Sequence, residues 1–108
     1  MPNNETGMSD LETANRTETK PKTKRPKLYK VILENDDFTP REFVIKVLNT
    51  VFRLSEEEAY RVMMTAHQQG NCIVSVYTKD IAETKAKDAT DLGNQYGYPL
   101  LFTIEPEE

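Results

Sequence analysis

The larger apolar side chains of this sequence are confined to one part of the chain. Residues 1–27 contain only Met1, Met8 and Leu11 of this class, among many Asn, Thr, Glu, Lys and Pro residues. A segment this poor in apolar residues cannot bury enough surface to offset the entropy lost on ordering, so we predict a disordered N-terminal extension there. Regular apolar patterning begins at Leu28 and continues to the end. We therefore predict a single folded domain over residues 28–108.

The apolar pattern of this domain switches between the period of a strand and the period of a helix. β-Branched and aromatic runs predict strands over residues 28–33, 72–77 and 99–104. Helical spacing predicts three helices, of which the second and third end at Gly70 and Gly93 and the third is capped by Thr78. The order β-α-α-β-α-β favours a two-layer α+β domain, in the broad α/β class, with a three-stranded antiparallel sheet and three helices on one face.

Two capping sequences predict where the first two helices begin. Thr39 is the expected N-cap of the first helix, with Pro40 in the first helical position and Glu42 completing a capping box. Ser55 and Glu58 repeat the same signature before the second helix.

Charge and composition narrow the class of partner and the compartment. Residues 1–27 carry six basic and four acidic side chains, so the −4 of the whole chain leaves −6 on residues 28–108. An acidic domain disfavours nucleic acid as the main partner, and we read the short basic run over residues 20–27 as a solvated linker. No apolar run approaches the ~18 residues of a membrane span, and the start does not resemble a secretory signal. With one cysteine, Cys72, the chain fits a reducing compartment, and we expect a cytoplasmic protein.

Catalytic chemistry has few candidate residues. The only nucleophile–base pair is Cys72 with His67, five residues apart across a predicted helix end and in no known catalytic motif. A metal site drawn from Asp36, Asp37 and His67 matches no known loop spacing, and we expect no metal. The four glycines form no phosphate-binding loop, so we expect no cofactor and no enzymatic activity.

The loop Asn35-Asp36-Asp37 leaves two interpretations open. Asn and Asp stabilise turns by hydrogen bonding to their own backbone, and acidic residues suit the start of the following helix. The second interpretation is that these carboxylates await a cation.

Several separated motifs resemble the ClpS adaptors of the bacterial ClpAP protease. They are Tyr29–Leu33, Asn35–Pro40, Glu42–Val44, Met63, His67-Gln68-x-Gly70, Ala82–Lys85 and Tyr98–Leu101. The resemblance covers residues 28–108, and the family fold has the order of elements predicted above. It implies an adaptor that binds N-degrons, which are proteins whose first residue is Leu, Phe, Tyr or Trp. The adaptor hands them to the ATP-driven unfoldase ClpA, which feeds the peptidase ClpP.

The resemblance also assigns residues to this task. Asn35, Asp37 and His67 would hold the α-amino group of the substrate, since an α-ammonium is a three-donor cation that needs an amide oxygen, a carboxylate and an unprotonated imidazole nitrogen. The remaining substrate-binding residues would shape the loop or line the pocket for the first side chain: Asp36, Thr39, Val44, Met63, Ala66 and Leu100. The unfoldase would dock on a surface that includes Asp80, Glu83 and Lys85.

Three positions depart from the commoner family pattern. Arg41 stands where methionine is usual at the pocket rim, Ala66 where a larger aliphatic residue is common, and Asp80 where Glu is usual. From Arg41 we expect a preference for an acidic or neutral second residue over a basic one. From Ala66 we expect a roomier pocket with a different ranking of first residues. These changes are typical of a diverged second copy of the adaptor, acting as a monomer.

Two other functions compete with this interpretation. One is a structural interaction module, similar to a ribosomal stalk domain, in which the Asn-Asp-Asp loop is only a turn and N-terminal identity is ignored. The other is a hydrolase built on Cys72 and His67, which would show turnover that alkylation of the thiol abolishes.

Overall fold

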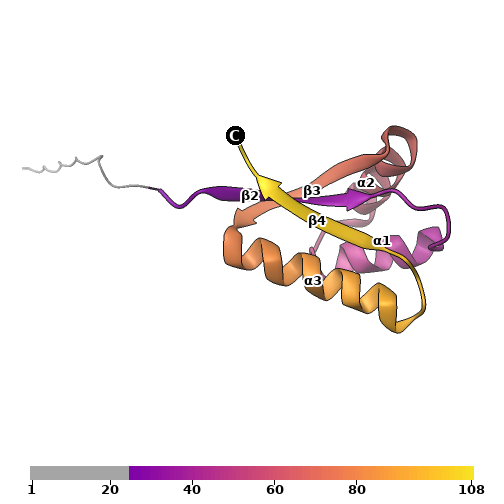
Figure 1. The fold of residues 1–108 in the computed structure, drawn as a ribbon. Helices are drawn as coiled ribbons and strands as arrows, with labels where there is room; N and C mark the ends of the chain where they lie inside the picture. Colours follow the sequence, from indigo (N-terminus) through magenta and orange to yellow (C-terminus); the bar gives the residue numbers. More distant parts are fainter. Residues whose placement is uncertain (1–24) are drawn as a thin grey trace, which may run out of the picture.

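The computed structural model describes residues 25–108, so residues 1–24 of the predicted N-terminal extension lie outside the described part of the chain. The elements are β2 (Leu28–Glu34), α1 (Arg41–Thr50), α2 (Glu56–Gln69), β3 (Asn71–Thr78), α3 (Lys79–Gln95) and β4 (Leu101–Pro106) (Figure 1). The predicted order β-α-α-β-α-β is confirmed. None of the helices in residues 25–108 is long and apolar enough to cross a bilayer.

The three strands form one antiparallel sheet in the order β3-β2-β4. The central strand is β2, in which Val31 pairs with Ser75 on one side and with Ile104 on the other. The register between β2 and β3 shifts after Val31, as a β-bulge would produce. The pairing confirms the predicted three-stranded antiparallel sheet.

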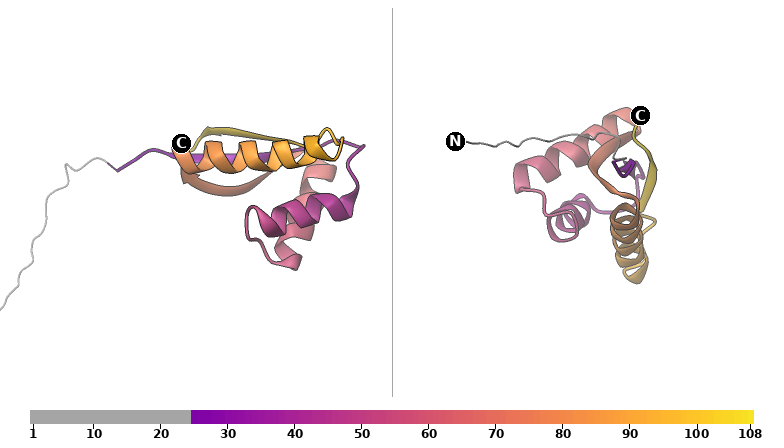
Figure 2. Two further views of the ribbon diagram at one scale, coloured as in Figure 1. Left: turned by 90° about the horizontal axis from the view of Figure 1, so that it is seen from below. Right: turned by 90° about the vertical axis from the view of Figure 1, so that its left-hand side faces the viewer.

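The helices pack on one face of this sheet, as Figure 2 shows from two further sides. On that face Val31 and Leu33 of β2 join the hydrophobic core, and Phe52 packs on Phe102 with ring centroids 5.1 Å apart. Each fully buried side chain of this size contributes about 1.5–3 kcal/mol. On the opposite face, apolar side chains of the edge strands remain exposed: Ile73, Val76 and Leu101.

The start and end of α2 follow the sequence prediction. The Ser55 hydroxyl accepts from the Glu58 backbone N–H at 3.1 Å, and the Ser55 N–H donates to the Glu58 carboxylate at 3.0 Å. The bond from the backbone of Ser55 holds the pKa of the Glu58 carboxyl below its usual value. Gly70 ends the helix with φ 98°, a left-handed conformation that favours glycine. The capping box and the C-cap are therefore confirmed.

The prediction that Thr39 caps α1 is wrong. The helix begins at Arg41, Pro40 occupies the N-cap position, and within residues 25–108 no side-chain hydrogen bond caps the helix. The Thr39 hydroxyl donates instead to the Asp36 carboxylate at 2.9 Å. A hydrogen bond to a charged acceptor is about twice as strong as one between neutral groups. This explains why the Thr39 hydroxyl binds the Asp36 carboxylate and does not cap the helix. Glu42 accordingly completes no capping box.

The ends of α3 differ from the prediction in two ways. Thr78 does stand at the N-cap position, but its side chain makes no capping bond. Gly93 does not end the helix, which continues to Gln95. A Cβ at Gly93 would lie 2.8 Å from the Cβ of Leu100, so the position needs glycine for close packing and not for chain reversal.

Candidate functional site

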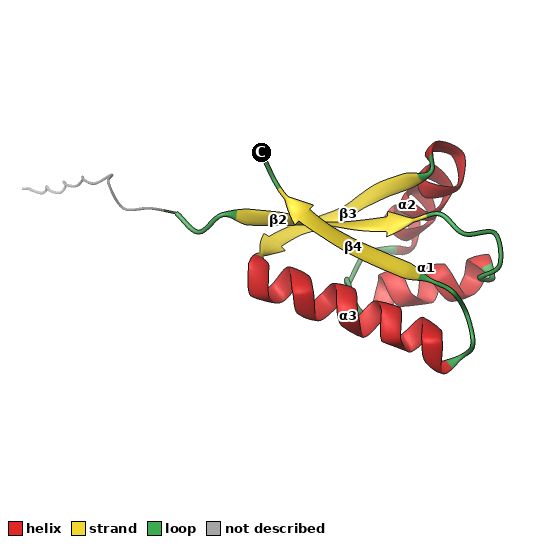
Figure 3. Cartoon of the chain, in the orientation of Figure 1, coloured by secondary structure: helices red, strands yellow, loops and turns green. Residues whose placement is uncertain are grey.

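A cavity opens between the β2–α1 loop, α1, α2 and the residue that precedes β4. Figure 3 shows that the β2–α1 loop and the α3–β4 connection lie at the same end of the domain. The volume of the cavity is about 160 Å³. This is less than the ~300–1,000 Å³ typical of small-molecule sites, so the cavity suits a single side chain. It is lined by Leu33, Glu34, Asn35, Asp36, Asp37, Arg41, Val44, Met63, Ala66, His67 and Leu100.

The floor of the cavity is apolar and comes from four different segments. Leu33 is the next-to-last residue of β2, Val44 lies on α1, Met63 and Ala66 lie on α2, and Leu100 immediately precedes β4. All five side chains belong to the hydrophobic core, and each is at most 6% exposed. Because the core is close-packed and continuous with this floor, the cavity has a fixed depth and a water-poor base.

The β2–α1 loop is held in shape by one carboxylate. Asp36 accepts hydrogen bonds from the backbone N–H groups of Phe38 at 2.9 Å and Thr39 at 2.7 Å, in addition to the Thr39 hydroxyl. The Asn35 N–H donates to the Gly70 carbonyl at 3.0 Å and ties the loop to the end of α2. The loop is therefore a fixed wall of the cavity, and Asp36 acts mainly as its organiser.

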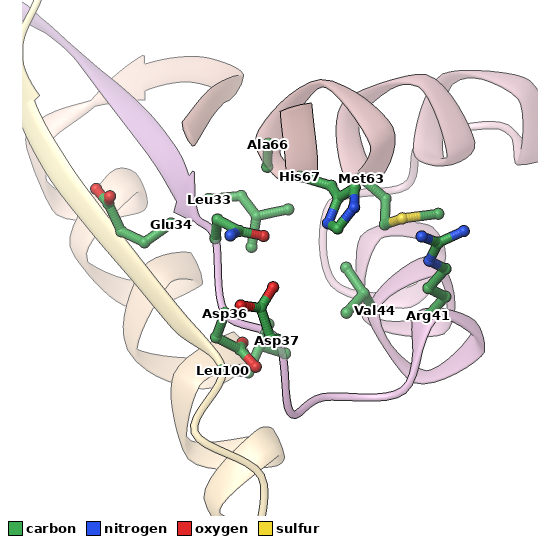
Figure 4. A pocket seen from close by; sticks show the side chains of 11 residues that line it. Leu33, Glu34, Asp36, Asp37, Arg41, Val44, Met63, Ala66, His67 and Leu100 are labelled. Atoms are coloured by element: carbon green, nitrogen blue, oxygen red, sulfur yellow. The ribbon is translucent and has the colours of Figure 1, made fainter. Parts of the chain in front are cut away.

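The polar groups at the mouth are exposed. Asn35 and Asp37 lie on the loop, and His67 projects from the last turn of α2. Within residues 25–108 the Asp37 side chain makes no hydrogen bond or ion pair, whereas Asp36 makes three bonds. In Figure 4 both carboxylates come from the loop on one side of the cavity, and His67 reaches it from the helix above. The mouth therefore presents acceptors to a cation, over an apolar floor.

Arg41 forms the opposite side of the mouth. It is the first residue of α1 and is exposed, while Val44, one turn further along the same helix, lies on the floor. Figure 4 shows Arg41 and Val44 together, across the cavity from Asp36 and Asp37.

The cavity brings together nine of the ten substrate-binding residues predicted from the sequence, and Thr39 supports the loop without lining the cavity. The prediction missed Leu33 and Glu34. Leu33 could have been found, because it follows Val31 by two residues in a strand and so faces the same side. The Glu34 carboxylate instead accepts from the Thr103 hydroxyl at 2.9 Å, and in Figure 4 it points away from the cavity.

The Cys72–His67 pair lacks the features of a catalytic dyad. Partial burial raises the pKa of the Cys72 thiol, whereas a nucleophilic cysteine needs a lowered one. The Cys72 thiol donates to the Ile73 carbonyl at 3.4 Å, and Cys72 does not line the cavity. Within the described residues no group of three His, Cys, Asp or Glu side chains is placed to hold a metal ion.

The three predicted docking residues lie on α3, near a second, larger hollow of about 500 Å³. Asp80 and Lys85 line this hollow, and Glu83 is exposed on the same helix. The ammonium of Lys85 donates to the Val51 carbonyl at 2.8 Å, so it also satisfies the end of α1. The two hollows share no lining residue.

Comparison with known proteins gives consistent matches. The family described as "ATP-dependent Clp protease adaptor protein ClpS" matches residues 24–103. The "ATP-dependent Clp protease adapter protein ClpS 2" of Rhizobium meliloti is 67% identical over 94% of this chain and all of that protein. The ClpS 1 protein of Bradyrhizobium diazoefficiens is 60% identical over the same shares. Among solved structures, Agrobacterium tumefaciens ClpS2 bound to L-phenylalaninamide has 66% identity and a TM-score of 0.75, covering 77% of this chain and all of that one.

Proposed function

Because the chain belongs to the ClpS family of ATP-dependent Clp protease adaptors, we propose that its cavity binds the first residue of N-degron proteins. The ligand is a free N-terminal Leu, Phe, Tyr or Trp residue on a protein or peptide. The adaptor captures this residue and delivers the protein to which it belongs to the Clp protease.

One observation carries this proposal: the cavity combines an apolar floor with acceptors at the mouth, on Asn35, Asp37 and His67, that have no side-chain hydrogen bond within residues 25–108. An aromatic or aliphatic side chain would fill the floor, while the α-ammonium would donate to Asn35, Asp37 and His67. An acetylated or internal amine lacks both the charge and the donors, so Asp37 would lose water without gaining a partner. A free N-terminus is therefore preferred.

The solved structure of Agrobacterium tumefaciens ClpS2 supports the same assignment. Its ligand, L-phenylalaninamide, has a free amino group, an aromatic side chain and an amide in place of the first peptide bond. It therefore has the chemistry of an N-terminal Phe residue.

The expected affinity follows from the sizes of these contributions. Burying a Leu or Phe side chain contributes about 1.5–3 kcal/mol, and each charge-assisted hydrogen bond about 1.5–3 kcal/mol. Association costs at least ~4 kcal/mol in lost freedom. With one buried side chain and three such bonds, the most favourable balance is about −8 kcal/mol, which corresponds to a dissociation constant on the order of micromolar. Such reversible capture suits an adaptor that must release its cargo.

A pair of peptides tests the proposal. Fluorescence anisotropy with a labelled peptide that begins with Phe should show binding on the order of micromolar, and its N-acetylated twin should bind at least about 100-fold more weakly, because two or more charge-assisted bonds are lost. If neither peptide bound, or if both bound equally, a structural interaction module would replace this proposal.

Delivery is the second part of the proposed function. The acceptor is a ClpA-type AAA+ unfoldase, docked on the surface of α3 around Asp80, Glu83 and Lys85. In this proposal the chain acts as a monomer in the bacterial cytoplasm and performs no catalysis, because the ATP-driven steps belong to the unfoldase.

Reversing a charge on α3 tests the docking surface. Glu83 is exposed, so Glu83→Lys should leave peptide binding unchanged and reduce unfoldase-dependent degradation of a Phe-starting protein by at least about tenfold. Glu57→Lys makes the same charge change at an exposed position of α2 and serves as the matched control. Equal rates of degradation with both variants would show that the unfoldase docks on a different surface.

A further inference from the structure

The mouth of the cavity carries both signs of charge, although an α-ammonium needs only acceptors. Asp36 and Asp37 stand on one side and Arg41 on the other. We infer that Arg41 selects N-degrons whose second residue is Asp or Glu over those whose second residue is Lys or Arg. This inference rests on the proposed function, since it places the first residue in the cavity.

The charge of Arg41 is available to a ligand. Within residues 25–108 the ion pairs are Lys30 with Glu105 and Lys87 with Asp91, neither of which involves Arg41. The loop carboxylates contribute to the cavity from the far side, and Asp36 is already occupied by three hydrogen bonds. The guanidinium therefore faces the cavity mouth without a neutralising partner in the described part of the chain.

The placement of Arg41 indicates which part of a ligand it meets. With the α-ammonium at Asp37 and the first side chain on the floor beside Val44, the peptide must leave across the mouth. The next Cα lies only about 3.8 Å further along, so the second residue passes the rim that Arg41 forms. A free amino acid fits less well, because its amino and carboxylate groups share one carbon while Asp37 and Arg41 stand on opposite sides.

The other charges of the domain act in the opposite direction. Residues 28–108 have six more acidic than basic side chains, because the −4 of the whole chain includes an excess of two basic ones in residues 1–27. Glu42 follows Arg41 on α1 and is exposed, while the Glu34 carboxylate is bonded to Thr103. Without Arg41 this field would favour a basic second residue. Arg41 therefore decides the sign of the preference.

The size of the effect is modest because Arg41 is exposed and flexible. Exposed pairs of this kind change binding by about 1.5- to fivefold at low salt. The effect should fall as ionic strength rises, since screening acts over about 10 Å at 0.1 M salt.

Three peptides that differ only at the second residue test the inference: Phe-Asp-, Phe-Asn- and Phe-Lys-. Anisotropy at low salt should rank them Asp, then Asn, then Lys, with about two- to tenfold between the extremes. Arg41→Gln should reverse the order of Asp and Lys. Lys46→Gln removes the same charge from an exposed position on α1 that does not line the cavity, and it should keep the original ranking.

The outcomes separate this inference from the function on which it rests. If the Phe-Asn- peptide binds and its acetylated twin does not, the proposed function stands. Equal affinities for Phe-Asp- and Phe-Lys-, or a ranking unchanged by Arg41→Gln, would then overturn the role of Arg41 alone. If Lys46→Gln reverses the order as well, net charge and not Arg41 sets the preference. If no free Phe peptide binds, both ideas fall together.

Discussion

Asp37→Ala should weaken binding of a Phe-starting peptide by about 10- to 150-fold and leave thermal stability unchanged. The carboxylate would form a charge-assisted bond to the α-ammonium, and such bonds contribute about 1.5–3 kcal/mol. Its side chain is exposed and makes no hydrogen bond within residues 25–108, so the folded state loses nothing when it is removed. Anisotropy and thermal unfolding on the same preparation measure the two effects.

The adjacent Asp36→Ala is the matched comparison. This carboxylate accepts three hydrogen bonds inside the loop, including one from the hydroxyl of buried Thr39. Its loss should lower both stability, by about 1–3 kcal/mol, and binding, because the wall that carries Asn35 and Asp37 would no longer be fixed. If both variants lost the same amounts of stability and binding, or if Asp37→Ala bound the peptide as well as the original protein, the separate roles of the two carboxylates would be contradicted.

The sequence predicts most of this fold because its signals are local. The capping box needs only Ser55 and Glu58, and the end of α2 needs only Gly70, so each is readable within one turn of helix. The strands are equally legible from their β-branched runs, and the antiparallel sheet follows from the element order.

The errors arise where two local signals compete or where a contact spans the chain. Thr39 carries a proper N-cap signature, but Asp36 three residues earlier binds its hydroxyl. The hydrogen bond from the Lys85 ammonium to the Val51 carbonyl, 34 residues away, is a contact that the sequence did not indicate. Gly93 reads as a helix stop, and only the folded position of Leu100 shows why it is glycine. Periodicity and capping rules describe neighbours in the sequence, so they cannot predict contacts between residues that are distant along the chain.

The site shows the same difference between local signals, which the sequence reveals, and contacts between distant residues, which it does not. The cavity residues come from the β2–α1 loop, α1, α2 and the connection before β4, and spacing alone could not show that they meet. Their grouping follows from the resemblance to the ClpS family. Leu33 lies outside that group, although strand alternation places it on the core face beside the cavity.

Gly93→Ala should destabilise the protein even though alanine is the better helix former. In the absence of a neighbour, the exchange inside a helix would stabilise by up to about 1 kcal/mol. Here the new Cβ would lie 2.8 Å from the Cβ of Leu100, a residue that is only 2% exposed. A change of rotamer cannot move this Cβ atom, because it is attached directly to the backbone. Overpacking of this kind costs about 1–3 kcal/mol, so we expect a net loss of stability and a melting temperature lower by several degrees.

The same substitution should also change the shape of the binding cavity. Leu100 contacts Gly93 on one side and lines the cavity on the other, so a shift away from α3 narrows the floor. Peptides that begin with Phe or Trp should therefore lose more affinity than one that begins with Leu. Gly97→Ala is the control: nothing lies within 4 Å of its Cβ position, so its cost comes only from a φ of 79° and should leave the peptide ranking unchanged. A gain in melting temperature for Gly93→Ala would rule out the close contact with Leu100, because the helix propensity of alanine would then outweigh the cost of overpacking.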